Sequence, residues 1–346
     1  MKVLFEVTHP AMVHLFRHAI AELDARGHRV FVTSREKDLT TRLLDEYGVP
    51  HVPLSSKGST PLSLASEWVV REFRMLRTVR AVDPDVVVSQ NSPAAVHAAR
   101  LSGATSIVFD DSEAERAAAR LVHPFADVVC TPANFGRDLG EKQRRYEGYH
   151  ELAYLHPDRF SPDRDVLERH GVAVDERYFV VRFVSWGAHH DVGQSGFSEP
   201  VRRALVSRLT EHGTVYVTSE RPLPEAFEPY RLPIPPTCLH DLLNYADLYV
   251  GDSQTMATEA SVLGTPAVRY NSFAGNGDMS NFVELEEEYG LLHSTADECD
   301  ALSSALALAS DPDTGDRFRA RRARLLAEKM DVTAFVVDTI LVEGAA

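Results

Sequence analysis

The chain has 346 residues, a length that suits two domains of roughly 150 residues each better than a single core. Its formal net charge of −15 argues against nonspecific binding to nucleic acid or to anionic lipid. Three scattered cysteines argue against a disulfide framework or a zinc site, and no apolar run approaches the length of a membrane span.

The balance of lysine, arginine and acidic residues bears on the salt content of the cytoplasm in which the protein works. Only five lysines occur, so that 36 − 5 = 31 of the basic residues are arginines. An acidic excess with scarce lysine favours a salt-adapted, halophilic and archaeal cytoplasm, because carboxylates stay hydrated at high salt. A GC-rich genome that favours arginine codons is the alternative. Residues 1–7 predict a strand and carry no signal-peptide pattern, so we expect a cytoplasmic protein.

In the first half of the chain, apolar runs of strand length alternate with helical stretches. Such an alternation predicts right-handed β–α–β crossovers and a parallel sheet. The predicted strands are 2–7, 29–33, 51–54, 85–89, 105–109 and 127–130, and the predicted helices are 39–47, 62–82, 93–101, 113–122 and one that ends near 26.

The alternation breaks at 147–165, where proline, glycine and aromatic residues predict a domain crossover rather than an element. A second series follows, with predicted strands at 178–185, 215–218, 248–250 and from 267, and predicted helices at 199–212, 239–245, 296–309, 317–328 and 332–342.

We therefore expect an α/β protein with two doubly wound, Rossmann-like parallel-sheet domains that face each other across a cleft. The expected first domain is 1–148 and the crossover is 149–177. The expected second domain is 178–330, and 331–346 is a last helix that packs back on the first domain.

The stretch 247–269 organises the second domain. It predicts a strand, a tight turn at Gly251, a helix that ends at Gly264, and another strand. Asp252 or Ser253 would cap the helix, and the amides of its first turn would then form an anion site at the carboxyl end of a strand.

Thr255 and Glu259 share another face of that helix, at positions i and i+4. A phosphate on the amides would place the hydroxyls of an attached ribose within reach of Glu259. The alternative is an ordinary capped strand–helix–strand unit with a solvated glutamate.

This stretch contains Asp-Ser, five residues and Glu-Ala, followed by Leu-Gly-x-Pro. The pattern resembles the nucleotide-sugar motif of the non-hydrolysing UDP-N-acetylglucosamine 2-epimerases, and it is similar to the donor motif of GT-B glycosyltransferases. The resemblance implies that Ser253, Gln254 and Thr255 hold the diphosphate and that Glu259 holds the ribose. Gln254 and Thr255 stand where the epimerases carry two glycines, so a diphosphate would approach less closely.

His9 follows the first predicted strand, where the epimerases carry an arginine and GT-B transferases place a base. It is a candidate general base for the acceptor, and the alternative is a histidine that only caps the next helix. Gln90 or Asn91 stands where the epimerases carry an acidic residue. Either amide would bind a sugar hydroxyl, or Asn91 or Ser92 would cap the following helix.

Asp110 and Asp111 follow another predicted strand, and Asp111 is a catalytic candidate that would bind or polarise the acceptor. One of the two carboxylates is expected to cap the next helix. In the second domain, Arg269 ends a strand and would touch the diphosphate or the sugar.

The turn after the strand 178–185 resembles the epimerase turn whose histidine contacts the substrate. The resemblance implies a catalytic role for His189 and a donor contact for His190, although either could fill the epimerase role. Trp186 would stack on a base or a sugar ring, or would pack between the domains. We expect no metal, because adjacent histidines rarely converge on one ion.

The pattern over nearly the whole chain resembles an archaeal and bacterial domain-of-unknown-function family with a GT-B-like fold. The matching features are Thr-x-Pro after the first strand, Arg-Gly-His-Arg-Val at 26–30, Tyr-His-Glu-Leu-Ala-Tyr-Leu-His at 149–156, and Gly-Asp-Ser-Gln-Thr-Met at 251–256.

These resemblances lead us to expect a metal-independent, inverting transferase that uses a nucleotide sugar, UDP-linked, as its substrate and needs no further cofactor. A 2-epimerase and a non-catalytic nucleotide-sugar-binding protein are the alternatives. The expected partners are the nucleotide-sugar donor and a sugar or lipid-linked acceptor. We expect no binding to nucleic acid, and the sequence leaves peripheral membrane contact and a homodimer open.

Overall fold

The computed structural model describes residues 1–36, 38–56, 61–184, 196–219, 222–271, 274–275 and 278–345. The chain divides into two compact units, one formed by Met1–Arg159 with Lys329–Ala346 and the other by Phe160–Glu328. The second unit is thus inserted into the first, and the boundary at Arg159 falls inside the stretch 149–177 that the sequence marks as a crossover.

The first unit is built on a parallel sheet with the strand order β3-β2-β1-β4-β5-β6-β7 among the described residues. β1 lies next to both β2 and β4, so the direction of strand addition reverses between β1 and β4. Ligands of open parallel sheets bind at the strand carboxyl ends near such a reversal. The strands are β1 (Lys2–Val7), β2 (Arg29–Glu36), β3 (Val52–Ser56), β4 (Val86–Gln90), β5 (Thr105–Phe109), β6 (Val128–Pro132) and β7 (Gln143–Tyr146).

Helices connect these strands, and two of them begin with a proline directly after a capping residue. His9 caps the first and Ser92 caps the fourth, where proline at the first helical position gives up no needed hydrogen bond. The elements are α1 (Pro10–Ala25), α2 (Asp38–Glu46), α3 (Pro61–Val82), α4 (Pro93–Ser102), α5 (Arg116–Val122), the 3-10 turn η1 (Gly140–Lys142) and α6 (Leu152–Leu155).

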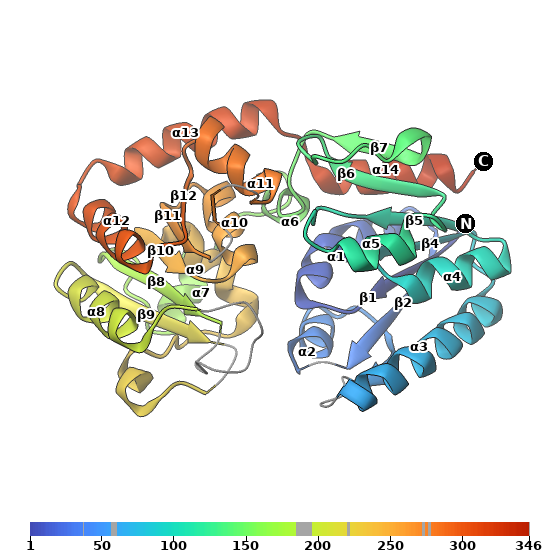
Figure 1. The fold of residues 1–346 in the computed structure, drawn as a ribbon, viewed down its shortest axis with the longest axis horizontal. Helices are drawn as coiled ribbons and strands as arrows, with labels where there is room; N and C mark the ends of the chain where they lie inside the picture. The colour runs from blue at the N-terminus through green and yellow to red at the C-terminus, as the bar shows by residue number, and fades with distance from the viewer. Residues whose placement is uncertain are drawn as a thin grey trace. The chain divides into compact units, whose positions relative to one another are not determined.

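Helix α14 (Val332–Glu343) belongs to the first unit although it follows the second unit in the sequence. The hydroxyl of Thr333 donates a hydrogen bond to the carbonyl of Ala153 in α6 at 2.6 Å. Arg159 donates to Asp331 at 2.7 Å and to Glu22 in α1 at 2.8 Å. These bonds hold α14 against α1 and α6, and Figure 1 shows it as a red helix among the blue and green elements of this unit.

The second unit contains a parallel sheet with the order β12-β11-β10-β8-β9 among the described residues. Its strands are β8 (Tyr178–Phe183), β9 (Thr214–Ser219), β10 (Leu248–Gly251), β11 (Ala267–Tyr270) and β12 (Leu292–Thr295). Its helices are α7 (Arg164–Arg169), α8 (Glu199–Leu209), η2 (Glu225–Tyr230), η3 (Pro236–Cys238), α9 (Leu239–Tyr245), α10 (Gln254–Leu263), α11 (Ser280–Val283), the short π-helix η4 (Glu284–Glu288), α12 (Glu298–Ser310) and α13 (Thr314–Glu328).

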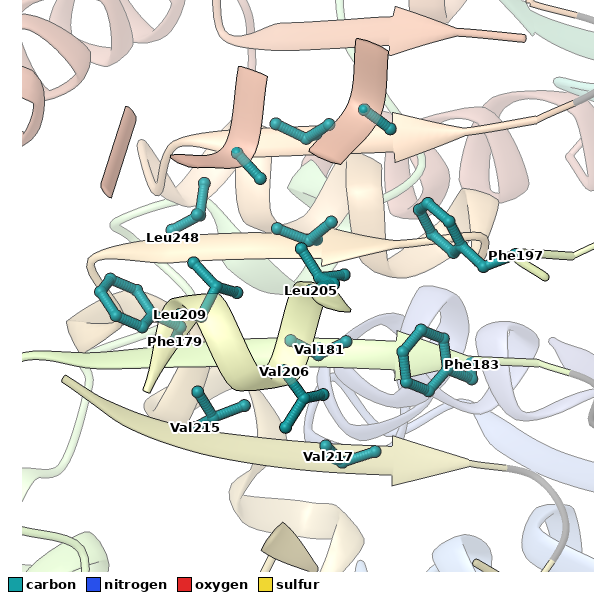
Figure 2. Close-up of a cluster of buried hydrophobic side chains, with 14 of the residues drawn as sticks. Phe179, Val181, Phe183, Phe197, Leu205, Val206, Leu209, Val215, Val217 and Leu248 are labelled. Atoms are coloured by element: carbon teal, nitrogen blue, oxygen red, sulfur yellow. The ribbon is translucent and has the colours of Figure 1, made fainter. Parts of the chain in front are cut away.

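The core of the second unit forms between one face of this sheet and helices α8 and α12. Figure 2 shows Leu205 and Leu209 of α8 beside Val181 and Phe179 of strand β8. Strand β8 is almost completely buried, as strands of a parallel sheet with covered faces are, and this explains its largely apolar sequence.

Two parallel-sheet α/β units confirm the predicted fold class, and several local predictions are wrong. Strands β7 and β12 and helices α6 and α7 were not predicted, and the last two lie in the expected crossover. Helix α5 begins at Arg116 rather than 113, and its N-cap, Glu115, makes no side-chain capping bond. Asp110 and Asp111 therefore do not cap it. No helix among the described residues is long and apolar enough to cross a membrane.

Candidate functional site

The carboxyl end of β10 leads directly into α10 through Asp252 and Ser253. Ser253 has extended backbone torsions, and its Oγ accepts a hydrogen bond from the amide of Met256 at 3.4 Å. Ser253 is therefore the N-cap, one of the two residues that the sequence predicts for this role.

The amides of Gln254 and Thr255 occupy the first two helical positions. Neither N–H group has a hydrogen-bond partner in the part of the chain that the structure describes. Gln254 is exposed and Thr255 is half-buried, so solvent reaches this turn. Since the aligned peptide dipoles make this end of α10 positive, the two amides are suited to an anionic oxygen.

The opposite end of α10 is closed by the protein itself. Gly264 ends the helix with φ +80°, a conformation that favours glycine. Arg322 of α13 donates to the carbonyl of Val262 at 3.0 Å and places its positive charge at the negative end of the helix. Among the described residues, the backbone groups of α10 that remain open to a ligand are therefore mainly the N–H groups at its start.

Asp252 connects the end of β8 with the start of α10. Its Oδ1 accepts a hydrogen bond from the amide of Val184 at 2.7 Å. A Cβ atom at Gly196 would collide with Oδ2 of the same carboxylate, so only glycine fits there without a shift. Burial raises the pKa of Asp252, although the Val184 amide and the charges of Arg202 and Arg182 oppose the rise.

Glu259, the predicted ribose ligand, lies on the second turn of α10 and is only 3% exposed. Its Oε1 lies 2.9 Å from Nε2 of His240 on α9. The alternative of a solvated glutamate is therefore wrong. His240 lies on another helix, and no local pattern in the sequence indicates that it pairs with Glu259.

Arg269 is completely buried at the end of β11. Its guanidinium donates to Asp278 and, at 2.8 Å, to the hydroxyl of Ser294, and it lies 3.6 Å from the ring centroid of Phe282. Burial lowers the pKa of Arg269, and the carboxylate of Asp278 opposes that change. The sequence suggests a contact with a diphosphate or sugar, but a ligand would have to displace these neighbours to reach the guanidinium.

The predicted residues Trp186, His189 and His190 lie outside the described residues. Their roles remain expectations from the resemblance.

In the first unit, His9 is exposed just beyond the carboxyl end of β1. Its Nδ1 accepts a hydrogen bond from the amide of Ala11 at 3.3 Å, so a neutral imidazole in this position carries its proton on Nε2. The capping function that the sequence offers as an alternative is therefore present. To act as a base through Nδ1, His9 would first have to release the Ala11 amide.

Asp111 lies at the same edge of the first sheet, just beyond β5. Its Oδ2 lies 3.0 Å from Nδ1 of His150, and its Oδ1 accepts a hydrogen bond from the side-chain Nε2 of Gln90 at 3.3 Å. Burial opposes ionisation of Asp111, but His150, a backbone hydrogen bond and Gln90 together outweigh that effect, so the pKa of Asp111 is lowered. The structure thus brings a carboxylate and an imidazole together that are 39 residues apart, and the sequence assigned no catalytic role to His150.

The neighbouring carboxylate, Asp110, has a structural role. It is fully buried, and its Oδ1 accepts from Asn91 at 2.6 Å and from the amide of Ser112 at 3.0 Å. Its Oδ2 lies 3.0 Å from Nε2 of His123. Asn91 is therefore held inside the unit, while Ser92 caps α4. Among the described residues, no group of three or more His, Cys, Asp or Glu side chains is placed to hold a metal ion.

Two doubly wound parallel sheets, with polar residues at the strand carboxyl ends, define the GT-B-like class of fold. Solved structures of this class align over essentially the whole chain. A UDP-GlcNAc 2-epimerase from Neisseria meningitidis bound to UDP-GlcNAc aligns with a TM-score of 0.70 at 12% identity, covering 99% of this chain and 100% of that one.

Two glycosyltransferase structures are also similar. The spinosyn forosaminyltransferase SpnP aligns with a TM-score of 0.65 at 15% identity and covers 100% of both chains. The glycosyltransferase VinC in complex with DTDP aligns with a TM-score of 0.63 at 13% identity and also covers 100% of both chains. At these identities the likeness establishes the fold.

The chain belongs to the family described as Protein of unknown function (DUF354), which matches residues 1–311. This membership confirms the family resemblance found in the sequence. No curated protein matches the chain.

Proposed function

We propose that the protein binds a UDP-linked sugar at the start of α10 and transfers the sugar to an acceptor by metal-independent inverting displacement. One observation carries the proposal: the amides of Gln254 and Thr255 have no partner in the described chain and lie at the positive end of a capped helix. Their place at the carboxyl end of β10 supports a site for a diphosphate.

The proposed chemistry needs charge stabilisation at the departing diphosphate. An acceptor oxygen forms a bond to the anomeric carbon as the bond from that carbon to UDP breaks. The amides of Gln254 and Thr255, with the hydroxyl of Ser253, would offset the negative charge that develops on the UDP oxygens. Glu259 would hold the ribose, and His9 would take the acceptor's proton after releasing the Ala11 amide.

A sugar 2-epimerase is the second candidate, and the pair formed by Asp111 and His150 favours it. A carboxylate and an imidazole 3.0 Å apart at the sheet edge are suited to moving a proton. The similarity to a UDP-GlcNAc 2-epimerase bound to UDP-GlcNAc supports the same donor for both candidates. A non-catalytic nucleotide-sugar-binding protein is the third.

The decisive test removes one amide proton and leaves the helix in place. Gln254 is the first helical residue, where proline is favoured, and the extended torsions of Ser253 suit a residue before proline. Gln254→Pro therefore deletes the N–H group, while the matched Gln254→Ala variant deletes only the side chain. Titration calorimetry with UDP, other nucleoside diphosphates and nucleotide sugars, at high salt, compares the two variants with the wild type.

We expect Gln254→Pro to weaken UDP binding about 10- to 100-fold, since a hydrogen bond to a charged group contributes about 1.5–3 kcal/mol. Gln254→Ala should bind within about threefold of the wild type. Equal losses in both variants, or no binding of any nucleotide by the wild type, would contradict the proposed site.

Product analysis separates the candidates once the donor is known. Release of UDP that depends on an added acceptor supports transfer. Deuterium uptake at the sugar C2 in heavy water without an acceptor supports epimerisation. Binding without either reaction supports the non-catalytic protein.

A further inference from the structure

The first half of α3 turns charged side chains inward and apolar side chains outward. Glu67 and Arg71 are only 8% and 14% exposed. Trp68, Val69 and Phe73, on the other faces of the same two turns, are 47%, 65% and 68% exposed. An amphipathic helix on a globular protein shows the reverse arrangement.

Buried ion pairs fix this orientation. Glu67 accepts two hydrogen bonds from Arg35 of β2, each at 2.6 Å, and a third from the hydroxyl of Ser55 at 2.9 Å. Arg71 donates to Glu6 of β1 at 2.9 Å and to the hydroxyl of Ser92 at 3.0 Å. Rotating the helix to hide its apolar residues would break these bonds and leave charges buried without partners.

The second half of α3 is an ordinary core helix. Met75 and Val79 are completely buried and pack with Leu4 and Val87 of the sheet. The exposed apolar residues are therefore confined to the part of α3 that is anchored by ion pairs, and Val70, at 42% exposure, belongs to the same group.

Two arginines continue the outward side. Phe73, Arg77 and Arg80 are spaced i, i+4 and i+7 and therefore lie on one side of the helix. Arg77 and Arg80 are exposed and make no ion pair or hydrogen bond among the described residues. The nearby carboxylate of Glu72 lies 3.3 Å from His97, and Glu67 is bound to Arg35. The outward side thus combines apolar surface with positive charge.

We propose that this α3 face, formed by Val69, Val70, Phe73, Arg77 and Arg80, docks on the surface of a lipid bilayer that contains anionic lipids. The apolar side chains would enter the boundary between head groups and acyl chains, and the arginines would contact lipid phosphates. The inference is independent of the proposed function.

Charge favours a bilayer over a second copy of the chain. A second copy of the same face would offer Arg77 and Arg80 no unengaged carboxylate, because Glu72 lies beside His97, whereas anionic lipids supply negative charge directly. The net charge of −15 repels an anionic surface at long range, but salt screens that repulsion beyond about 10 Å. Arginines in direct contact with lipid phosphates keep their attraction.

The test is co-sedimentation of the full chain with vesicles of phosphatidylcholine, with and without phosphatidylglycerol. We expect the double variant Val69→Ser, Phe73→Ser to lose at least about tenfold in partitioning, because two large apolar side chains no longer enter the bilayer. Arg77→Gln and Arg80→Gln should each lose about fivefold, and only on vesicles that contain the anionic lipid.

The matched control is Val342→Ser in α14, a residue with the same 68% exposure as Phe73 in the same unit. The Val342→Ser variant should bind vesicles as the wild type does. All variants should melt within about 3 °C of the wild type, because the altered side chains are exposed. Failure of the wild type to bind either vesicle, or an equal loss in Val342→Ser, would overturn the proposal. Light scattering that shows a dimer dissociated by Phe73→Ser, without vesicle binding, would assign the face to a second copy instead.

Discussion

Nε2 of His240 on α9 lies 2.9 Å from Oε1 of Glu259 on α10, and both side chains are almost completely buried. The histidine holds one oxygen of the carboxylate that the sequence assigns to a ribose. A ribose ligand and His240 would therefore have to share the carboxylate of Glu259. Nucleotides that lack the ribose hydroxyls can show whether Glu259 binds a ribose or only pairs with His240.

The first prediction concerns recognition of the ribose by Glu259. If the carboxylate binds the ribose hydroxyls, the wild type should bind UDP about tenfold more tightly than 2′,3′-dideoxy-UDP, since hydrogen bonds to a charged group are lost. Glu259→Gln keeps the shape and should remove most of that preference. Calorimetry with both nucleotides measures the ratio. A wild type that binds both equally would leave Glu259 as a structural partner of His240 only.

The second prediction concerns Asp252. Asp252→Asn keeps an oxygen for the Val184 amide and removes a buried charge, whereas Asp252→Ala leaves that amide unpaired. We expect the alanine variant to be less stable than the asparagine variant by about 1–2 kcal/mol. Chemical denaturation measures the difference, and equal stabilities would show that the bond to Val184 contributes nothing.

The same carboxylate predicts a pH effect. Because the folded-state pKa of Asp252 is raised above the ordinary value of 3.8, burial of its charge destabilises the folded state as pH rises through that range. Asp252→Asn should therefore be more stable than the wild type at neutral pH, and the advantage should shrink toward pH 3.8. An advantage that grows on acidification would contradict this reasoning.

The third prediction concerns His293 on β12. The hydrogen bond with Glu286 raises its pKa to about 9, burial opposes the rise, and Asp300 adds to it. Because the folded-state pKa exceeds the ordinary value of 6.5, the stabilisation is complete below pH 6.5 and is lost as pH rises through about 9. His293→Gln should therefore melt below the wild type at pH 6.5, and the two should converge above about 9.

Thermal melts across that pH range measure the effect, with His170→Gln as the control. His170 is an exposed histidine in the same unit, and its replacement should not produce a gap that closes with pH. A gap for His293→Gln that stays constant with pH would show that the ion pairs do not stabilise the fold.

The fourth prediction separates the two roles of His9. His9→Asn keeps an acceptor for the Ala11 amide, while His9→Ala loses it and should be less stable by about 1 kcal/mol. If His9 is also the general base, both variants should lose acceptor-dependent UDP release. Activity that persists in His9→Asn and is lost in His9→Ala would assign His9 to capping alone.

Most of the fold could be predicted because apolar runs and helical stretches alternate clearly along the chain. The edge strand β7 was missed because its residues, Gln143 to Tyr146, include two exposed arginines and carry no apolar run. Strand β12 is only four residues long and has a single buried residue. Edge strands of this kind are specified by their neighbours rather than by their own composition.

In the candidate site, too, local features could be predicted from the sequence and contacts between distant elements could not. The cap by Ser253 is a local interaction over three residues, so the sequence suffices to propose it. The partners of Glu259 and Asp111 come from other elements, 19 and 39 residues away, and depend on how those elements pack. The sequence therefore suffices to propose Glu259 and Asp111 as site residues, but not to supply the histidines beside them.

The return of α14 to the first unit has a consequence for synthesis of the protein. Residues 1–159 leave the ribosome before the helix that contributes the fully buried Val336, Val337 and Ile340 to their unit. The nascent first unit must therefore keep an apolar surface exposed while all of residues 160–328 are translated. The inserted unit is continuous in sequence, so we expect it to complete its folding first, although its residues are translated later.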